Sequence, residues 1–175
     1  MKKTILFIAG LLMLIAGRMN AQSDTIYNSA VSYNDYIVSV QFELGDAIKT
    51  FSSLFGAEEL NEKNIREGYS ILVMASENCL RKVENLKDFR GNTALRDASI
   101  ELFRFYERTI KIEYKELMEI QLLVSPSESD FERWEEINKT VTDNEKPFDE
   151  KFANAQTEFA REFNFTLEAP ETEEE

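Results

Sequence analysis

The sequence predicts an all-α protein, folded as an antiparallel up-down four-helix bundle of long helices. Glycine and proline are scarce, at six and three residues in a chain of 175, whereas residues that favour helices are abundant. In four long segments, apolar residues recur at gaps of three or four, which is the period of a helix and not of a strand. Short polar turns separate these segments, and such turns join helices that run antiparallel.

The first predicted helix covers residues 26–55. Ser23 or Asp24 can cap its start, and Gly56 can end it. Gly45 lies inside this helix, where a glycine costs about 1 kcal/mol relative to alanine. We expect a close crossing with another helix as the reason for this glycine.

The second predicted helix covers residues 65–86, with Asn61 as its cap and the turn-forming run 88–92 after it. The single cysteine of the chain, Cys79, lies beside apolar residues of this helix and is expected to be buried and unreactive. The alternative is an intermolecular disulfide after export, because one cysteine forms no disulfide within the chain.

The third predicted helix covers residues 95–124. Asn92 or Thr93 can cap its start, and its apolar face includes Ile112. It is expected to stop before Pro126, because a proline disfavours the helical conformation in the residue before it and donates no backbone hydrogen bond.

The fourth predicted helix covers residues 131–163, and residues 127–130 resemble a capping box at its start. Pro147 interrupts the apolar pattern without changing its seven-residue spacing, so we expect a helix that is kinked or broken near Pro147. The phenylalanines of this segment, with Trp134, are expected to fill the core; the alternative is an apolar pocket for a lipid or another hydrophobe. An alternative to the whole bundle is a coiled-coil dimer of long helices.

Residues 1–21 are predicted to be a cleavable signal peptide. Lys2 and Lys3 precede an apolar run from Thr4 to Ala16, and Ala21 is a small residue suited to the cleavage site. A helix of that run spans about 20 Å, less than a bilayer core of about 30 Å. No cysteine follows the run, so no lipoprotein anchor is expected. An uncleaved membrane anchor is the alternative.

The bundle domain is expected to cover residues 22–165, and the glutamate-rich residues 166–175 are expected to form a disordered acidic tail. Removal of residues 1–21 takes away three positive charges and no negative ones, so the net charge changes from −13 to −16. Such an acidic chain is not expected to bind nucleic acid or to insert stably into a membrane after cleavage. It is expected to be a monomer or a homodimer.

The composition excludes several kinds of catalytic and cofactor site. The chain has no histidine, so it contains no Ser-His-Asp triad, Cys-His pair or imidazole metal ligand. One cysteine excludes a thiolate zinc cage, and no glycine-rich phosphate loop is present. The glutamates between residues 107 and 136 fall mostly off the apolar faces. We therefore expect no metal and no cofactor.

Three short segments resemble a known family. They are Tyr33-Asn34-Asp35-Tyr36-Ile37-Val38, Leu95-Arg96-Asp97-Ala98, and the C-terminal residues Ala155-Gln156, Phe159-Ala160 and Asn164-Phe165. This pattern is similar to that of exported helical proteins of Leptospira and Bacteroidota, described as surface proteins of unknown function. The resemblance covers most of the chain after residue 21. It implies export and an all-helical fold, and it carries no active-site residues.

The most distinctive polar cluster is formed by Asn34, Asp35 and Tyr36. Tyr33 lies on the apolar face, so Asn34 and Asp35 are expected to lie off it. One interpretation is a ligand-contact patch formed by Asn34, Asp35 and Tyr36. The alternative is structural: Tyr33 packs in the core and pairs its hydroxyl with a neighbouring helix.

These observations predict an exported, non-enzymatic protein that binds a protein or glycan partner in the periplasm or at the cell surface. One alternative is an enzyme with carboxylates only, such as a glycosidase or lyase. In that case a polar residue should break the apolar faces, and Asn138 and Glu145 come closest to doing so. The other alternative is a structural envelope or stress protein that acts as a spacer.

Overall fold

The computed structural model describes residues 28–56 and 60–167 of the chain. This part is all-helical, contains no strand and is 82% helix, which confirms the predicted all-α class. Its helices, in chain order, are α1 (Ala30–Ser53), η1 (Leu54–Gly56), α2 (Glu62–Glu84), α3 (Ala94–Thr109), η2 (Ile110–Tyr114), α4 (Lys115–Gln121) and α5 (Glu128–Glu162). No helix in the described ranges is long and apolar enough to span a membrane. The predicted signal peptide and most of the predicted tail lie outside these ranges.

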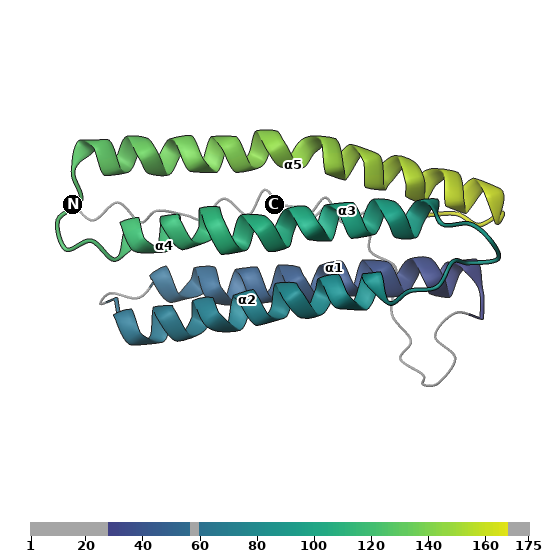
Figure 1. The fold of residues 1–175 in the computed structure, drawn as a ribbon, viewed down its shortest axis with the longest axis horizontal. Coiled ribbons are helices and arrows are strands. Elements are labelled where there is room, and N and C mark those ends of the chain that lie inside the picture. Colours follow the sequence, from purple (N-terminus) through teal and green to yellow (C-terminus); the bar gives the residue numbers. More distant parts are fainter. Residues whose placement is uncertain (1–27, 57–59, 168–175) are drawn as a thin grey trace, which may run out of the picture.

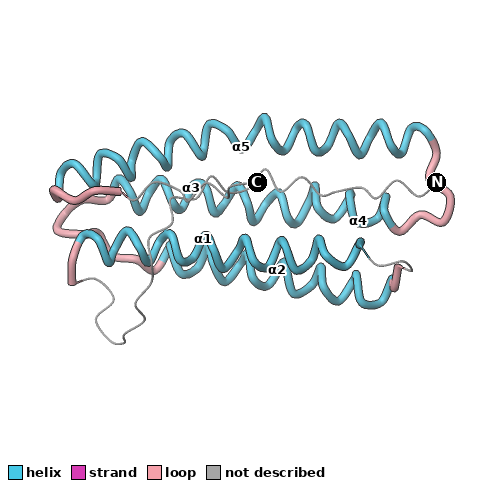
Figure 2. The backbone as a smooth tube through the Cα atoms, turned by 180° about the vertical axis from the view of Figure 1, so that it is seen from behind, coloured by secondary structure: helices cyan, strands magenta, loops and turns pink. Residues whose placement is uncertain are grey.

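The long helices lie side by side along the long axis of the molecule (Figure 1). α2 packs against both α1 and α3, and α5 packs along α3, whereas α1 and α5 touch over a shorter stretch. Figure 2 shows from behind that the loops between them lie at the two ends of the molecule. α3, η2 and α4 follow one another along one line and together form the third long segment (Figure 1).

The helix starts are fixed by side-chain caps, as the sequence predicts for two of them. Asn61 caps α2, and Ser127 forms a capping box with Asp130 at the start of α5. α1 begins at Ala30, later than predicted, because Ser29 and Ser32 form a capping box there. The earlier cap candidates at residues 23 and 24 lie outside the described ranges.

The ends of α1 and the start of α3 differ in detail from the prediction. α1 ends at Ser53, and a single tighter turn continues the chain to Gly56. Thr93 occupies the cap position of α3, but its side chain accepts no capping hydrogen bond from the backbone of the first turn. Instead, Asn92 Oδ1 accepts a hydrogen bond of 3.0 Å from the backbone N–H of Ala94. Of the two predicted cap residues, Asn92 is therefore the one whose side chain caps α3.

The third long segment contains a π-helical turn that the sequence pattern does not predict. η2 spans Ile110–Tyr114, and the π-turn holds more residues than an α-helical turn, which shifts the buried face. Ile110 and Tyr114 are buried, whereas Ile112 is 51% exposed. The prediction that Ile112 lies on the apolar face is therefore wrong.

α5 continues through Pro147 without ending and restarting. Its axis changes direction in the middle of the helix (Figure 1). Of the two predicted forms, a kinked or a broken helix, only the bent and continuous one describes α5. A proline bends a helix in this way because its ring clashes with the preceding turn and removes one backbone hydrogen bond.

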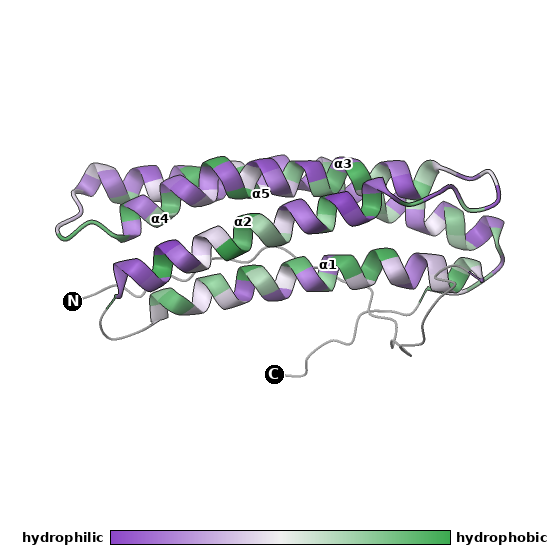
Figure 3. Ribbon diagram, turned by 60° about the horizontal axis from the view of Figure 1, so that its bottom comes forward, coloured by the Kyte–Doolittle hydropathy of each residue, from purple (hydrophilic) through white to green (hydrophobic). Residues whose placement is uncertain are grey.

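Hydrophobic and hydrophilic residues alternate along each helix in Figure 3, as expected of helices that bury one face. At one end of the core lies an aromatic cluster formed by Tyr33, Phe89, Phe159 and Phe163, with ring centroids 4.7 to 5.7 Å apart in its closest pairs. The Tyr33 hydroxyl donates a hydrogen bond of 2.9 Å to the backbone oxygen of Lys87. Tyr33 thus packs in the core, as the structural interpretation predicts, but its hydroxyl pairs with the loop after α2 and not with a helix.

Two further side chains allow a comparison with the predicted core. Cys79 is fully buried, and burial, with a smaller contribution from Glu43, raises the pKa of its thiol to about 11. This agrees with the predicted unreactive cysteine. Phe131, in contrast, is 38% exposed, so the prediction that the phenylalanines of the last segment all fill the core is wrong at this position.

Leu102 and Glu135 provide a test of the assigned faces. Leu102 is fully buried in α3 and Glu135 is exposed on α5. We expect Leu102→Ala to lower the free energy of unfolding by about 2–5 kcal/mol through lost burial and a residual cavity. Glu135→Ala should change it by less than about 0.5 kcal/mol. Denaturant titration measures both, and equal effects would contradict the assignment.

Candidate functional site

The three residues of the predicted patch differ in how deeply they are buried. Asn34 is buried, and its Oδ1 accepts a hydrogen bond of 2.8 Å from Nε2 of Gln156 in α5. Its Nδ2 donates to Oδ1 of Asp35 at 3.3 Å. Asp35 and Tyr36 are half-buried. The expectation that Asn34 lies off the buried face is therefore wrong, because α1 contacts both α2 and α5 and buries a wider arc than a single stripe.

A second polar group lies inside the contact between α3 and α5. Glu145 and Asp149 are one turn apart on α5, and the Tyr106 hydroxyl lies 3.2 Å from Glu145 Oε1 and 3.2 Å from Asp149 Oδ1. Glu145 is only 4% exposed and Tyr106 only 6%. We call these three residues the acid cluster. The hydroxyl carries one proton, so it donates to one carboxyl group at a time.

Burial controls the ionisation of the acid cluster. It raises the pKa of Glu145 to about 7, and the nearby charge of Asp149 adds to the shift, while the hydrogen bond from Tyr106 opposes it. Burial also raises the pKa of Asp149. The pKa of Tyr106 is raised, first by burial and then by both carboxylates. Glu145 is therefore a carboxyl group of this cluster that titrates near neutral pH.

The sequence pattern identifies only part of this cluster. Glu145 breaks the apolar face of its helix and was predictable as an unusual position, whereas Asn138, the other such position, is only half-buried and donates to the backbone oxygen of Trp134 at 2.8 Å. Asp149 and Tyr106 were not predicted. The signal for Asp149 is its spacing of four from Glu145, which places both carboxyl groups on one helix face.

A groove lies on the outer side of the same part of α5, between α5 and α3. Its volume is about 580 Å³, and it is lined by Glu101, Arg104, Phe105, Arg108, Asn144, Pro147 and Phe148. We call it the α3–α5 groove. Its inner wall is aromatic, because Phe105 and Phe148 stack with ring centroids 5.0 Å apart and an interplanar angle of 22°. The bend at Pro147 brings the ring of this proline into the same wall.

The charged groups of the α3–α5 groove are unevenly paired. Glu101 accepts a hydrogen bond of 2.6 Å from Lys151 across the groove. Arg104 donates one bond of 2.8 Å to Glu84 of α2. Arg108 is 3.7 Å from Glu113 and forms no hydrogen bond with any of the described residues. Arg108 thus keeps the full donor capacity of its guanidinium group.

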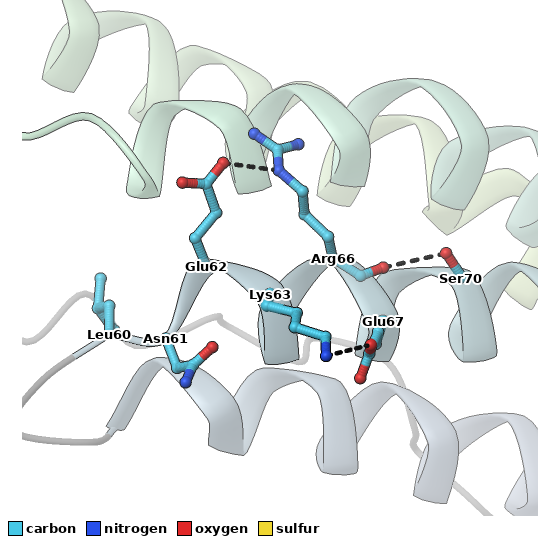
Figure 4. Close-up of a pocket in the computed structure, with 7 residues that line it drawn as sticks. All are labelled: Leu60, Asn61, Glu62, Lys63, Arg66, Glu67 and Ser70. Atoms are coloured by element: carbon cyan, nitrogen blue, oxygen red, sulfur yellow. Dashed lines mark hydrogen bonds and ion pairs between the residues drawn. The ribbon is translucent and has the colours of Figure 1, made fainter.

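A second hollow, of about 790 Å³, lies at the start of α2 and is shown in Figure 4. All of its lining residues come from one continuous segment, Leu60 to Ser70. Arg66 is already engaged, by Glu62 at 2.9 Å and by two bonds of 2.6 and 3.0 Å to Glu119. Lys63 lies 3.8 Å from Glu67. Its charges therefore neutralise one another, and among the described residues no second element forms an opposite wall.

Within residues 28–56 and 60–167, no group of three or more Cys, Asp or Glu side chains is arranged to hold a metal ion. No protein-family model matches the chain, and no curated protein or solved structure matches it. The resemblance to exported helical surface proteins therefore stays a prediction, and the chemistry of the site is argued from its own residues.

Proposed function

We propose that the chain is an exported, non-enzymatic protein with an up-down four-helix bundle as its scaffold, and that it binds its ligand in the α3–α5 groove. One observation carries this proposal. The groove lies between α3 and α5, and it combines an aromatic wall with the guanidinium group of Arg108, which has no hydrogen-bonded partner among the described residues. Sites for small molecules have this composition of an apolar lining and few polar groups.

The bundle is supported by which helices are neighbours. Helices adjacent in the chain are also adjacent in space, from α1 and α2 through α3 to α5. The connections between them are short, as in bundles whose helices alternate in direction. In such a bundle, α3 and α5 are neighbouring helices, and they form the two walls of the groove.

The acid cluster favours binding over the alternative of a carboxylate-only enzyme. Glycosidases need two carboxyl groups that flank the substrate. Here Glu145 is almost fully buried, and the same tyrosine hydroxyl contacts both carboxyl groups. Neither Glu145 nor Asp149 lines the α3–α5 groove. The spacer alternative explains the long helices but gives no reason for an arginine with only a 3.7 Å ion pair, to Glu113, beside an aromatic wall.

Export predicts a defined N-terminus for the mature protein. Cleavage after Ala21 leaves a chain that begins at Gln22, because Ala21 is the small residue that signal peptidase accepts beside the cut. Mass spectrometry of protein recovered from the periplasm or the medium should therefore give the mass of residues 22–175. A mass that includes residues 1–21 would show that the segment stays attached.

The groove is tested with a matched pair of substitutions on α5. Asn144 lines the groove and Asn154 does not, and both are exposed. Asn144→Trp should fill the groove, whereas Asn154→Trp adds the same side chain elsewhere. A thermal-shift screen with fatty acids, oligosaccharides and peptides should find a class that raises the Tm of the wild type and of Asn154→Trp but not of Asn144→Trp.

Two results of this screen would contradict the proposal. One is that every ligand that stabilises the wild type stabilises Asn144→Trp equally, which would place binding outside the groove. The other is turnover of a substrate that Glu145→Gln abolishes, which would establish the carboxylate-only enzyme.

A further inference from the structure

We infer that the α3–α5 groove binds a small monocarboxylic acid with an apolar body, such as a fatty acid, with its carboxylate on Arg108 and its body against the aromatic wall. This inference rests on the proposed function, because it assigns a chemical class of ligand to the same groove. It follows from three properties of the groove: the state of its charges, the nature of its wall and its dimensions.

The charges of the groove select a single negative charge. Lys151 neutralises Glu101, and Glu84 engages Arg104 from the side of α2. Arg108 is 59% exposed, and its one ion pair, with Glu113, is 3.7 Å long, beyond hydrogen-bonding distance. A ligand carboxylate can take two parallel bonds from this planar group. Glu113, 3.7 Å from Arg108, disfavours a ligand with a second negative charge.

The wall of the groove selects an apolar body. Phe105 and Phe148 stack face to face, and Pro147 continues their surface. The polar side chain that α5 adds to the lining, Asn144, is an amide without charge. Burial of a hydrocarbon chain against this wall removes apolar area from water on both molecules. A sugar would find no hydrogen-bond partner on the side chains of Phe105, Phe148 and Pro147.

The dimensions agree with a molecule of this class. About 580 Å³ lies within the range of pockets for small molecules, roughly 300–1,000 Å³. Along α5 the lining residues extend from 144 to 148, which is about 6 Å of helix axis. One ligand end therefore reaches Arg108 while the remainder lies along the seam between the helices.

Decanoate, at a concentration below micelle formation, is the probe for the experiment. The exported protein is labelled with ¹⁵N and titrated with decanoate, with neutral 1-decanol and with decylammonium. We expect saturable shifts of the amides of residues 101–108 and 144–148 with decanoate, weaker shifts with 1-decanol, and the weakest with decylammonium. This order distinguishes carboxylate recognition from the partition of any alkyl chain into an apolar surface.

The variants isolate the role of Arg108. Arg108→Gln should weaken the binding of decanoate about tenfold, as expected for the loss of a charge-assisted pair. The binding of 1-decanol should not change. Arg161→Gln is the matched control, because it also removes one exposed arginine, paired with Glu158 on the same helix α5, and it should leave the affinity within about twofold.

Three results would overturn the inference: no binding of decanoate, equal binding by Arg108→Gln and the wild type, or shifts confined to residues outside the groove. Each is distinguishable from failure of the proposed function. If another class of ligand in the thermal-shift screen still depends on Asn144, the groove is a binding site for a different chemistry. If no ligand depends on Asn144, the groove itself is not the site.

Discussion

Glu145→Gln should stabilise the protein at pH 8 and remove most of the loss of stability that the wild type shows between pH 5 and pH 8. Burial raises the pKa of Glu145 from 4.5 to about 7 in the folded protein. The stability that this group contributes is fully present below its unfolded pKa, and it is lost as the pH rises through the folded pKa. The shift corresponds to about 3 kcal/mol.

The sign of this effect is opposite to that of four carboxyl groups on the surface of the helices. Glu77, Glu116, Glu119 and Asp130 have lowered pKa values because they accept hydrogen bonds from Lys111, Arg133, Arg66 and Ser127, respectively. Those groups lose their contribution as the pH falls below about 4. The free energy of unfolding should therefore have a maximum in weakly acidic solution.

The control for Glu145→Gln is Glu150→Gln, which removes an exposed carboxyl group from the same part of α5. Denaturant titrations between pH 5 and pH 8.5 should give a flatter profile for Glu145→Gln alone. The glutamine keeps an oxygen that can accept the hydrogen bond from Tyr106, so the folded state is retained. A profile for Glu145→Gln that is parallel to that of the wild type would show that Glu145 does not titrate in this range.

Phe159→Ala should lower the free energy of unfolding by about 3–5 kcal/mol. Phe159 is 1% exposed and lies in the aromatic cluster, where its ring contacts those of Tyr33, Phe89 and Phe163. Its truncation removes burial from four rings at once and leaves a cavity that these rigid neighbours fill poorly.

Phe131→Ala is the matched control, because it makes the same change in the same helix at a residue that is 38% exposed. Its effect should be below about 1 kcal/mol. Thermal and denaturant unfolding measure both variants. If both substitutions lowered the free energy of unfolding by similar amounts, Phe131 and Phe159 would be buried alike, which would contradict their different exposure in the structure.

The helices themselves were predictable from the sequence because their signals are local. The gaps of three and four residues between apolar positions, and caps such as Asn61 and Ser127, depend on residues within one helix. The all-α class and the cap residues of α2 and α5 follow directly. The π-turn was not predictable in this way. The apolar residues near it, Ile110, Ile112 and Tyr114, fit more than one helical period, and packing against neighbouring helices decides which are buried.

The candidate site was largely not predictable, because it depends on which helices face one another. Asn34 and Gln156 are 122 positions apart, and Tyr106 lies 39 positions before Glu145. A periodic pattern shows that a face is buried but not which side chain lies opposite. Glu145 could be noticed in the sequence because it is a charged residue that breaks the apolar face of its helix. Arg108 gave no signal, because an arginine on a helix surface is ordinary until its partners are known.

The contact between Tyr33 and Phe159, with ring centroids 5.6 Å apart, has a consequence for the topology of the polypeptide. It brings the start of the first helix and the end of the last helix to the same end of the molecule (Figure 1). A short peptide can therefore join residue 167 to residue 28, and the chain can be reopened in the loop between α4 and α5. A circular permutant of residues 28–167 keeps every helix, and its new termini lie at the end of the molecule opposite the aromatic cluster.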